Sequence, residues 1–339
     1  MSDLAWRAPL SEAETVRRQL SRAGCLASGV RAERTGGFVV FPLTRAPPAP
    51  PSAGQLISHA FPPSRTPLPR RYSDLLEWPD ADRRELPRSF DVVGDVVLVR
   101  VPESLTGRSE EIGRALLAFV PGARIVGRDE GVQGIERRRR LVRIAGEGSW
   151  RTRHRENGLE LAVDLESAYF SPRLGHEHAR VAAAVRPGER VYDLCCGVGP
   201  FALAIAAGGR AREVVGVDLN PAAIDLLREN AVRLGLADRV RTVLAPVETF
   251  LREAGPVERA VLNLPHEGIK YLASVGAVVA RAGALHYYEV TARSEVGAPA
   301  RLLATLGPPG AWRLSERHVV HPYSPRSDLV AYELVREEG

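Results

Sequence analysis

The sequence contains little cysteine and almost no lysine, and it has no long apolar run. Three cysteines, with Cys195 and Cys196 adjacent and Cys25 alone, cannot form a disulfide framework, and no pair has the spacing of a zinc site. We therefore expect free thiols and no bound metal. No stretch approaches the roughly 18 consecutive apolar residues of a membrane span, and early acidic residues stand where a signal peptide is basic. These absences predict a cytoplasmic protein without a membrane segment.

The composition is that of a globular protein with a strong preference for arginine. The chain has 339 residues, 45% hydrophobic and 26% charged, which excludes disorder and fibres and fits two or three domains. Lys270 is the single lysine among the 46 basic residues. Arginine offers five fixed donors and a planar face, which favours phosphate and nucleobase recognition. With a pI near 9.4, the chain permits a nucleic-acid partner without proving one.

One stretch concentrates this arginine. Between positions 137 and 155, eight arginines accompany a single acid, Glu147, which gives a net charge of +7. A solvated loop or strand face is the simpler interpretation of such a run. If the run binds RNA instead, counterion release predicts that affinity falls steeply with salt concentration.

Helix and strand patterns divide the chain into four regions. Residues 1–45 are predicted to form a small module, with a helix over Glu12–Ala23 and a strand over Gly37–Leu43. Residues 46–85 are predicted to be a linker, because residues 46–70 contain eight prolines and cannot form the interior of a sheet or helix. We expect an α+β domain over residues 86–170 and an α/β domain over residues 171–339.

The two larger domains differ in the order of their elements. The α+β domain should contain a helix over Glu110–Phe119 and strands over Asp91–Val101, Arg124–Val126, Arg140–Ile144 and Leu159–Val163. After residue 181, strand-like and helix-like segments alternate, which predicts a parallel, doubly wound sheet. These segments are Arg190–Leu194, Phe201–Ala207, Glu213–Asp218, Ala222–Leu234, Val240–Leu244, Val257–Leu262 and Ile269–Ala280.

A glycine-containing loop follows the first of these strands. It runs Asp193-Leu-Cys-Cys-Gly197-Val-Gly199-Pro-Phe201 and leads into a predicted helix. Glycines here allow a ligand to approach the backbone at the carboxyl end of a strand, where α/β sheets bind ligands. The third glycine of G-x-G-x-x-G is missing, and the chain has no G-x-x-x-x-G-K-[ST] motif. A loop for a nucleotide cofactor is the favoured interpretation, and a plain structural turn is the alternative.

Two further polar positions follow later strands. Asp218 ends a strand 25 residues after Asp193, and a carboxylate there can accept hydrogen bonds from both hydroxyls of a ribose. Asn220 is expected to cap the next helix. Asn263 begins the run Asn-Leu-Pro-His after another strand. Its carboxamide donates and accepts, so it can hold the edge of a purine, and an ordinary turn is the alternative.

These motifs together resemble a known family. The pair D-x-x-x-G-x-G and V-D-x-N-P resembles class I S-adenosylmethionine (AdoMet) methyltransferases over residues 181–290. Other fragments resemble the archaeal and eukaryotic tRNA (guanine-37-N1)-methyltransferases, whose siblings are the wybutosine-synthesis aminocarboxypropyltransferases. These fragments are Leu86-Pro87, Asp91–Gly94, Gly146-Glu147, Glu156–Gly158, Asp164, Tyr169–Leu174, Glu177, Gly197–Phe201, Asn263–Pro265 and His286–Glu289. The resemblance covers most of the chain.

The resemblance implies an architecture and an activity. It implies a Rossmann-like class I methyltransferase domain, preceded by an α+β domain that binds RNA and assists catalysis and by a small tRNA-binding module. The implied reaction moves a methyl group from AdoMet to N1 of guanosine 37, next to the anticodon. The implied partner is tRNA, contacted at its anticodon loop and, through the N-terminal module, at its elbow. We expect a monomer without metal.

It also implies roles for individual residues. Glu177 occupies the position of the general base at guanine N1, and we expect burial to raise its pKa toward neutrality. Without the resemblance, Glu177 is simply an acid in the first turn of a helix. Arg137 or Arg138 would stabilise charge on O6, and Asn263 and Pro265 would hold the base. The implied cofactor-binding residues are Asp193, Cys195, Gly197, Gly199, Asp218, Leu219 and Asn263.

The sequence also departs from the family pattern. Cys195 and Cys196 replace a usual Phe-Ala pair, and Ala245-Pro246 stands where an acid commonly recognises the adenine amino group. His266 is either a purine contact or an exposed loop residue. Three alternatives to guanosine methylation therefore stay open: aminocarboxypropyl transfer, methylation of a wyosine precursor, and a degenerate RNA-binding protein.

Overall fold

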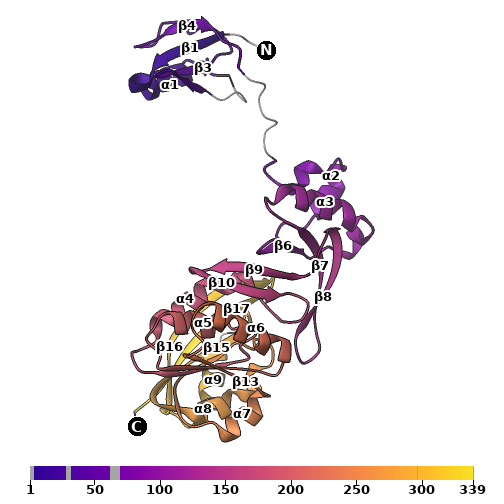
Figure 1. Cartoon of the computed structure of the whole chain (residues 1–339), viewed down its shortest axis with the longest axis vertical. Coiled ribbons are helices and arrows are strands. Elements are labelled where there is room, and N and C mark those ends of the chain that lie inside the picture. Colours follow the sequence, from indigo (N-terminus) through magenta and orange to yellow (C-terminus); the bar gives the residue numbers. More distant parts are fainter. Residues whose placement is uncertain (1–3, 28–31, 62–68, 296, 339) are drawn as a thin grey trace. The chain divides into compact units, whose positions relative to one another are not determined.

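The computed structural model describes the chain except for residues 1–3, 28–31, 62–68, 296 and 339 (Figure 1). The chain divides into two compact units, Met1–Asp74 and Leu75–Gly339, each with a hydrophobic core of its own. In the parts that the structure describes, no helix is long and apolar enough to cross a membrane.

The N-terminal unit is a four-stranded sheet with one α-helix. Its strand order is β2-β3-β1-β4, and β1 pairs antiparallel with both β3 and β4. The bounds are β1 Leu4–Pro9, α1 Ala13–Arg22, β2 Glu33–Thr35, β3 Phe38–Pro42 and β4 Gln55–Ser58. Trp6, Val16, Leu20 and Phe41 form much of its core. The predicted helix and strand of this module are confirmed apart from their end residues.

Part of the predicted proline-rich linker belongs to this sheet, so the expectation of an extended connection over residues 46–85 is wrong there. β4 pairs with β1, and the Trp6 indole N–H donates to the Ala53 carbonyl at 2.8 Å. The prolines flank β4 without entering it, so its N–H groups are available to the ladder. A 3-10 helix spans Tyr72–Leu75 and α2 spans Asp80–Glu85. Linker residues 62–68 lie outside the described residues.

The second unit begins with a mixed four-stranded sheet, in the order β5-β6-β7-β8, followed by the hairpin β9-β10. The bounds are β5 Asp91–Val93, β6 Val96–Val99, α3 Ser109–Phe119, β7 Ile125–Gln133, β8 Arg138–Gly146, β9 Arg151–Glu156 and β10 Leu159–Asp164. The single strand predicted over Asp91–Val101 is wrong. The chain reverses at Gly94, whose φ of +56° suits glycine, and a Cβ there would lie 2.2 Å from Thr152 Oγ1.

A seven-stranded sheet forms the rest of the unit, in the order β13-β12-β11-β14-β15-β17-β16. Its bounds are β11 Arg190–Leu194, β12 Glu213–Asp218, β13 Val240–Leu244, β14 Val257–Leu262, β15 Val279–Ala292, β16 Trp312–Ser324 and β17 Ser327–Arg336. The predicted parallel sheet is confirmed for β11 to β15, whereas β16 and β17 add an antiparallel edge that was not predicted. The strand order reverses between β11 and β14, which is where open α/β sheets bind ligands.

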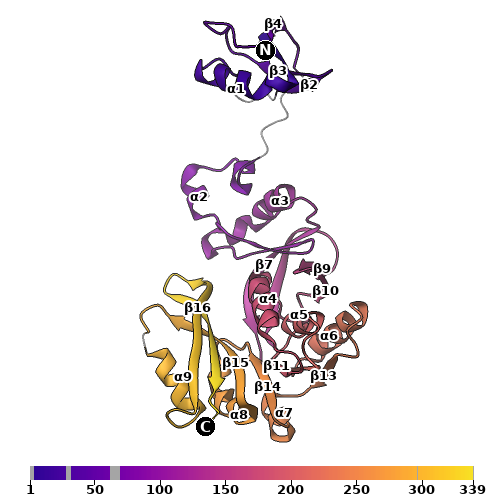
Figure 2. The same cartoon turned by 90° about the vertical axis from the view of Figure 1, so that its left-hand side faces the viewer.

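Helices cover both faces of this sheet (Figure 2). Their bounds are α4 Gly175–Ala184, α5 Pro200–Ala207, α6 Pro221–Arg233, α7 Val247–Glu253, α8 Leu272–Val278 and α9 Ala298–Leu306. α4, α5 and α6 share one buried cluster with Val191 and Tyr288, and α7, α8 and α9 share another with Tyr192 and Tyr287. The helix predicted over Ile269–Ala280 is wrong at its end, because β15 begins at Val279.

Candidate active site

The loop after β11 brings the backbone to the edge of the sheet. Cys195, Gly197 and Gly199 all have positive φ, at 65°, 55° and 89°. Glycine is required at position 199, since a Cβ there would lie 2.2 Å from Leu227 Cδ1. Pro200 then begins α5, so backbone N–H groups and the positive end of the helix dipole meet at this edge. The predicted ligand loop therefore has the geometry that its sequence suggested.

Asp193 lies beneath this loop and is completely buried. Its Oδ2 accepts a hydrogen bond from the Ala202 N–H at 3.0 Å, and Oδ1 has no partner among the described residues. Burial raises the pKa of Asp193 to about 7, against the opposing effect of the Ala202 N–H. A buried acceptor without a donor is costly, and a donor brought by a ligand would relieve that cost.

Asp218 ends β12 beside the loop. One carboxylate oxygen accepts from the Gly197 N–H at 2.8 Å and the other from the Asn220 N–H at 2.9 Å. Asn220 caps α6 as predicted, since its Oδ1 accepts from the Ala222 N–H at 3.0 Å. Because each carboxylate oxygen has two lone pairs, Asp218 keeps acceptor capacity for a ligand hydroxyl. Leu219 follows Asp218 and is partly exposed at the same edge.

The loop after β14 leaves the sheet next to the loop after β11. Leu194 and Leu262 are paired across these strands, so the residues that follow them emerge side by side. Asn263 Oδ1 is buried and has no hydrogen-bond partner in the described chain. The Pro265 carbonyl accepts from the Val290 N–H at 3.1 Å, which fastens this loop to β15. The sheet thus presents an unsatisfied amide oxygen close to Asp193 and Asp218.

His266 is the exposed member of this loop. Its Nε2 lies 2.9 Å from the Tyr323 hydroxyl, and the two rings meet edge to face. Burial lowers its pKa, and the positive charge of Arg137 lowers it further. His266 is thus exposed, with Tyr323 as its neighbour, and a contact with the purine stays a prediction.

Glu177 differs sharply from what was expected. Its side chain is buried, and its carboxylate accepts hydrogen bonds from three side chains: Arg180 at 3.0 Å, Tyr288 at 2.9 Å and His318 at 2.7 Å. Burial favours a higher pKa, but the Arg180 and His318 donors outweigh it, so the pKa of Glu177 is lowered. The predicted rise is wrong, because that expectation considered burial without these donors.

The arginines of the 137–140 run have separate surroundings. The Arg137 guanidinium lies over the Tyr169 ring, 5.3 Å from its centroid, at a position of positive φ in the β7–β8 turn. Arg138 is half exposed and pairs with Glu136 at 2.7 Å. Arg139 is buried, where it binds Asp129 at 2.5 Å and the Phe170 carbonyl at 3.0 Å. Of the two predicted candidates, Arg137 is the one that lies beside Tyr169.

Tyr169 connects this arginine to the ligand loop. A Cβ on Gly197 would lie 3.1 Å from the Tyr169 carbonyl oxygen, so the two backbones are in close contact. The charge of Arg137 also acts on the Cys195 thiol. Arg137, Tyr169 and the loop after β11 therefore form one continuous region.

The cysteines of the loop offer no nucleophile. Burial raises the pKa of the Cys195 thiol, and the Asp218 and Asp193 carboxylates raise it further. Burial also raises the pKa of the Cys196 thiol. Both are free thiols that stay protonated at neutral pH. In the described residues, no group of three or more His, Cys, Asp or Glu side chains is arranged to hold a metal ion.

The three side chains that donate to Glu177 were not predicted from the sequence. Tyr288 lay within a quoted fragment, but no role was inferred for it. Arg180 follows Glu177 by one helical turn, a spacing that does predict an ion pair. His318 lies on β16, 141 residues from Glu177, and no local pattern could have linked them.

Comparisons with known proteins identify related domains along the chain. Family profiles match three segments: the TRM5/TYW2 methyltransferase domain at residues 152–306, the TYW2 N-terminal domain at 72–149, and the tRNA methyltransferase 5 N-terminal domain at 7–50. A curated relative, the tRNA (guanine(37)-N(1))-methyltransferase Trm5b of Pyrococcus abyssi (strain GE5 / Orsay), is 34% identical over 286 residues. That alignment covers 84% of this chain and 83% of the relative.

Solved structures agree as well. The crystal structure of Trm5b from Pyrococcus abyssi is 30% identical, has a TM-score of 0.81, and is matched over 99% of this chain and 100% of that one. The complex of aTrm5 with tRNALeu is 25% identical, with a TM-score of 0.79 and coverage of 98% and 100%. The identity and coverage of these matches establish that the chain belongs to the TRM5/TYW2 methyltransferase family.

Proposed function

We propose that this protein transfers a methyl group from AdoMet to N1 of guanosine 37 in tRNA. The observation that carries the proposal is the meeting of three features at one edge of the sheet. These are the ligand loop after β11, the Asp218 carboxylate, and the buried Asn263 Oδ1 without a donor. The curated relative reported above, which is named a tRNA (guanine(37)-N(1))-methyltransferase, supports the reaction type.

The residues at this edge fit AdoMet chemically. Its amino group offers N–H donors to Asp193 Oδ1 or Asn263 Oδ1, and its ribose offers hydroxyls to Asp218. The positive φ values of Cys195 and Gly197 shape a loop that the cofactor can approach. Leu219, next to Asp218, would supply apolar contact. The cofactor supplies an electrophilic methyl group, and alignment of that group with the base then dominates the rate.

The guanine would be held between Asn263 and Arg137. Asn263 presents a carboxamide to the Watson–Crick edge of the base, and Pro265 fixes the loop that carries it. The Arg137 guanidinium stabilises the negative charge that grows on O6 while N1 loses its proton. Arg138 is the weaker candidate for this role because Glu136 already partners it.

Glu177 is the proposed acceptor of the N1 proton. In the balanced reaction, N1 bonds to the methyl carbon, the carbon–sulfur bond breaks, and the N1 proton leaves to the carboxylate. The lowered pKa keeps Glu177 ionised and ready to accept at neutral pH. His318 is the most exposed of its three donors, so exchanging its hydrogen bond for guanine N1–H is the smallest rearrangement.

The N-terminal unit would contact the tRNA elbow while the anticodon loop enters the site. A single-stranded loop allows guanosine 37 to leave its stack at low cost. We expect the enzyme to act as a monomer in the cytoplasm, with no metal requirement.

A second candidate is a step of the wybutosine pathway at position 37. The match of residues 72–149 to the TYW2 N-terminal domain favours it specifically. Such an enzyme would transfer the aminocarboxypropyl group of the same cofactor, or methylate a wyosine precursor. A degenerate RNA-binding protein, the remaining alternative, would show no saturable AdoMet binding in a calorimetric titration.

Nucleoside mass spectrometry distinguishes these reactions. Unmodified tRNA with G37 is incubated with the protein and AdoMet, alongside a G37→A transcript as the control. The proposal expects 1-methylguanosine at position 37 and no product with the control. An aminocarboxypropyl adduct, or activity restricted to a wyosine precursor, would contradict the proposal and favour the wybutosine-pathway function.

A further inference from the structure

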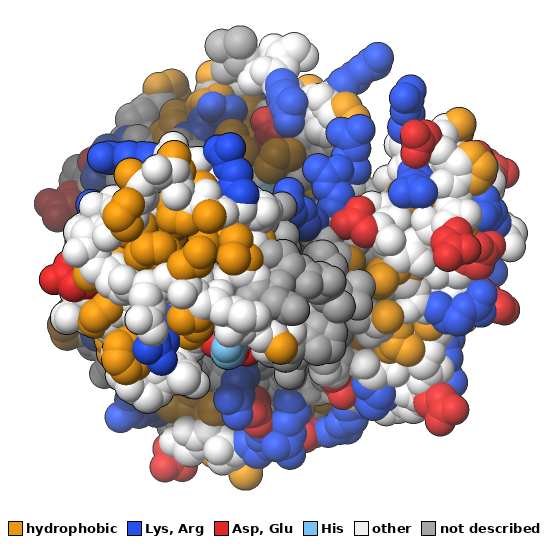
Figure 3. Space-filling view, turned by 90° about the horizontal axis from the view of Figure 1, so that it is seen from above, with side chains coloured by type: hydrophobic (Ala, Val, Ile, Leu, Met, Phe, Trp, Pro, Cys, Tyr) orange, Lys and Arg blue, Asp and Glu red, His pale blue; other side chains and the backbone are white. Residues whose placement is uncertain are grey.

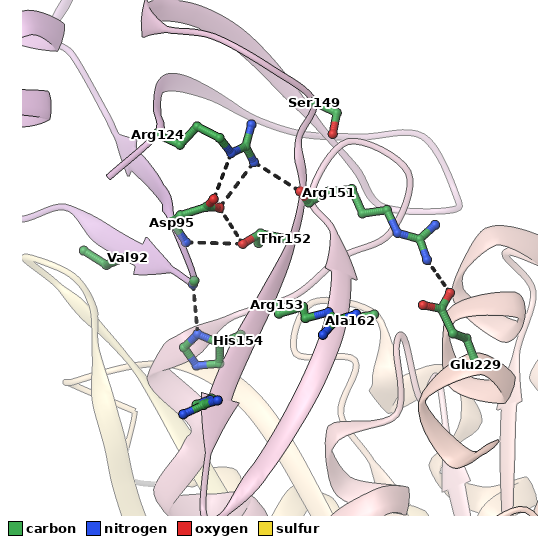
Figure 4. A pocket seen from close by; sticks show the side chains of 12 residues that line it. Val92, Asp95, Arg124, Ser149, Arg151, Thr152, Arg153, His154, Ala162 and Glu229 are labelled. Atoms are coloured by element: carbon green, nitrogen blue, oxygen red, sulfur yellow. Dashed lines mark hydrogen bonds and ion pairs between the residues drawn. The ribbon is translucent and has the colours of Figure 1, made fainter. Parts of the chain in front are cut away.

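A groove separate from the ligand loop lies between the β5–β6 turn, β9 and α6 (Figure 4). Its volume is about 930 Å³, and it is open to solvent. Four of its lining residues are arginines, at positions 124, 151, 153 and 155, against two acids, Asp95 and Glu229. A groove of this size with several guanidinium groups suits an extended anionic ligand.

The acids of the groove are already neutralised from within. Asp95 binds Arg124 at 2.8 Å and accepts the Thr152 hydroxyl at 2.6 Å. Glu229 on α6 forms an ion pair with Arg151 across the groove. Figure 4 shows both pairs. The acids therefore do not oppose an anion at the remaining two arginines.

Arg153 and Arg155 are the cations available to a ligand. Their side chains are 68% and 84% exposed, and both contact one carboxylate, Glu160, at 3.3 and 3.0 Å. Exposed ion pairs of this kind contribute only about 0–1 kcal/mol. Replacing Glu160 by a phosphate therefore costs little, and each planar guanidinium can donate two hydrogen bonds to the phosphate oxygens.

The strand sets the spacing between these cations. Arg151, Arg153 and Arg155 alternate with the inward-facing Thr152 and His154, so they project from one face of β9. Two residues of a strand advance about 6.6 Å, which is comparable to the separation of successive phosphates along a nucleic-acid strand. The arginines along β9 are thus spaced at about the distance between successive phosphates of a nucleic acid.

We propose that this groove binds the sugar-phosphate backbone of the tRNA, with Arg153 and Arg155 on neighbouring phosphates. The proposal rests on tRNA being the substrate. The groove acts on affinity without touching the reacting atoms, because its arginines lie outside the loops that carry Asp218 and Asn263. Basic and acidic side chains are intermixed on the face seen in Figure 3, so charge alone would not select this site.

The test measures tRNA affinity of the full-length chain as a function of salt concentration. In the double variant Arg153→Gln/Arg155→Gln, we expect binding at least about tenfold weaker, and a logarithmic salt slope smaller by about 2. AdoMet affinity, measured by calorimetry, should equal that of the unaltered chain and shows that the variant is folded.

The matched control is Arg241→Gln/Arg313→Gln. Their side chains are 50% and 57% exposed, and each pairs with one carboxylate, Glu213 or Glu337. They lie on β13 and β16, away from the groove. The control should bind tRNA within about twofold of the unaltered chain. Equal losses in both double variants, or an unchanged salt slope in the groove variant, would overturn the proposal.

Failure here is distinguishable from failure of the proposed function. If the unaltered chain methylates G37 while the groove variant binds tRNA normally, the groove assignment is wrong and the activity stands. If the unaltered chain makes no methylguanosine but the groove variant alone loses tRNA affinity, the groove stands and the activity is wrong.

Discussion

Asp193 under the β11 loop and Glu177 in the first turn of α4 are both almost fully buried, yet their pKa values move in opposite directions. Asp193 has one backbone donor, and burial raises its pKa to about 7. Glu177 has three side-chain donors, and Arg180 and His318 outweigh its burial. Burial fixes the cost of the charge, and the number of donors decides whether the protein offsets that cost. The β11 region leaves an acceptor for a ligand, whereas the α4 region holds a ready-made anion.

We expect the largest effect when the Glu177 carboxylate is removed. Glu177→Gln removes the proton acceptor, so turnover should fall by roughly 10²–10⁴-fold while AdoMet affinity stays nearly unchanged. Steady-state methylation and calorimetry measure the two quantities on the same preparation. Equal losses in turnover and cofactor affinity would remove the assignment of Glu177 as the base.

Next in size is the stability effect of the buried carboxyl in the ligand-free protein. The folded state retains a proton on Asp193 up to pH of about 7, while the unfolded state releases it near 3.8, so this group lowers stability as pH rises between those values. Asp193→Asn should therefore raise the free energy of unfolding by about 2 kcal/mol at pH 8, relative to its effect at pH 5. Denaturant titrations at both pH values test this, and the same change at each would contradict the raised pKa.

Glu177 has the opposite dependence. Because its folded pKa is lowered, its contribution to stability is present above about 4.5 and is lost as pH falls through the folded value. The two carboxylates thus give opposite slopes in one protein. In denaturant titrations extended below pH 4.5, the Glu177→Gln variant should lack the acid-side decline in stability that Glu177 gives the unaltered chain.

A smaller effect is expected for cofactor binding at Asp218. Its two oxygens already accept backbone N–H groups and would also accept ribose hydroxyls. Asp218→Ala should weaken AdoMet binding by roughly 10–100-fold, the loss of charge-assisted hydrogen bonds. Calorimetric titration measures the change, and an unchanged dissociation constant would exclude the ribose role.

The smallest effect should come from a carboxylate that shares the partners of Glu177 without its burial. Glu316 lies 3.6 Å from Arg180 and 3.1 Å from His318, but its side chain is half exposed. Glu316→Gln should change stability and turnover little, within about 0.5 kcal/mol, because solvent screens such pairs. A loss of turnover close to that of Glu177→Gln would contradict this expectation, because it would show that an exposed carboxylate paired with Arg180 and His318 is as important as the buried one.

Local pattern predicted one side of this comparison well. The sequence shows alternating strands and helices, which predicts a parallel sheet whose strands all end at one edge. The β11 loop, Asp218 and Asn263 lie at the carboxyl ends of three of these strands, so we could expect them to meet there. The donors of Glu177 come from α4, β15 and β16, and β16 belongs to an antiparallel edge that the parallel pattern did not predict. Four consecutive arginines likewise have no distinguishable roles in the sequence. In the structure Arg137 and Arg139 both lie over Tyr169, but Arg139 is buried and bound to Asp129.

The most direct test of the central claim is the pH dependence of a single turnover of methyl transfer, at saturating tRNA and AdoMet. A Glu177 that stays ionised, with Arg180 and Tyr288 still donating to it after guanine N1–H replaces His318, predicts a rate that stays level from about pH 8 down to about pH 5. A rate that falls tenfold per pH unit below neutrality, and does so only while Glu177 is present, would contradict the account. It would show that burial raises the pKa of the Glu177 carboxyl, and that its donors do not hold it ionised.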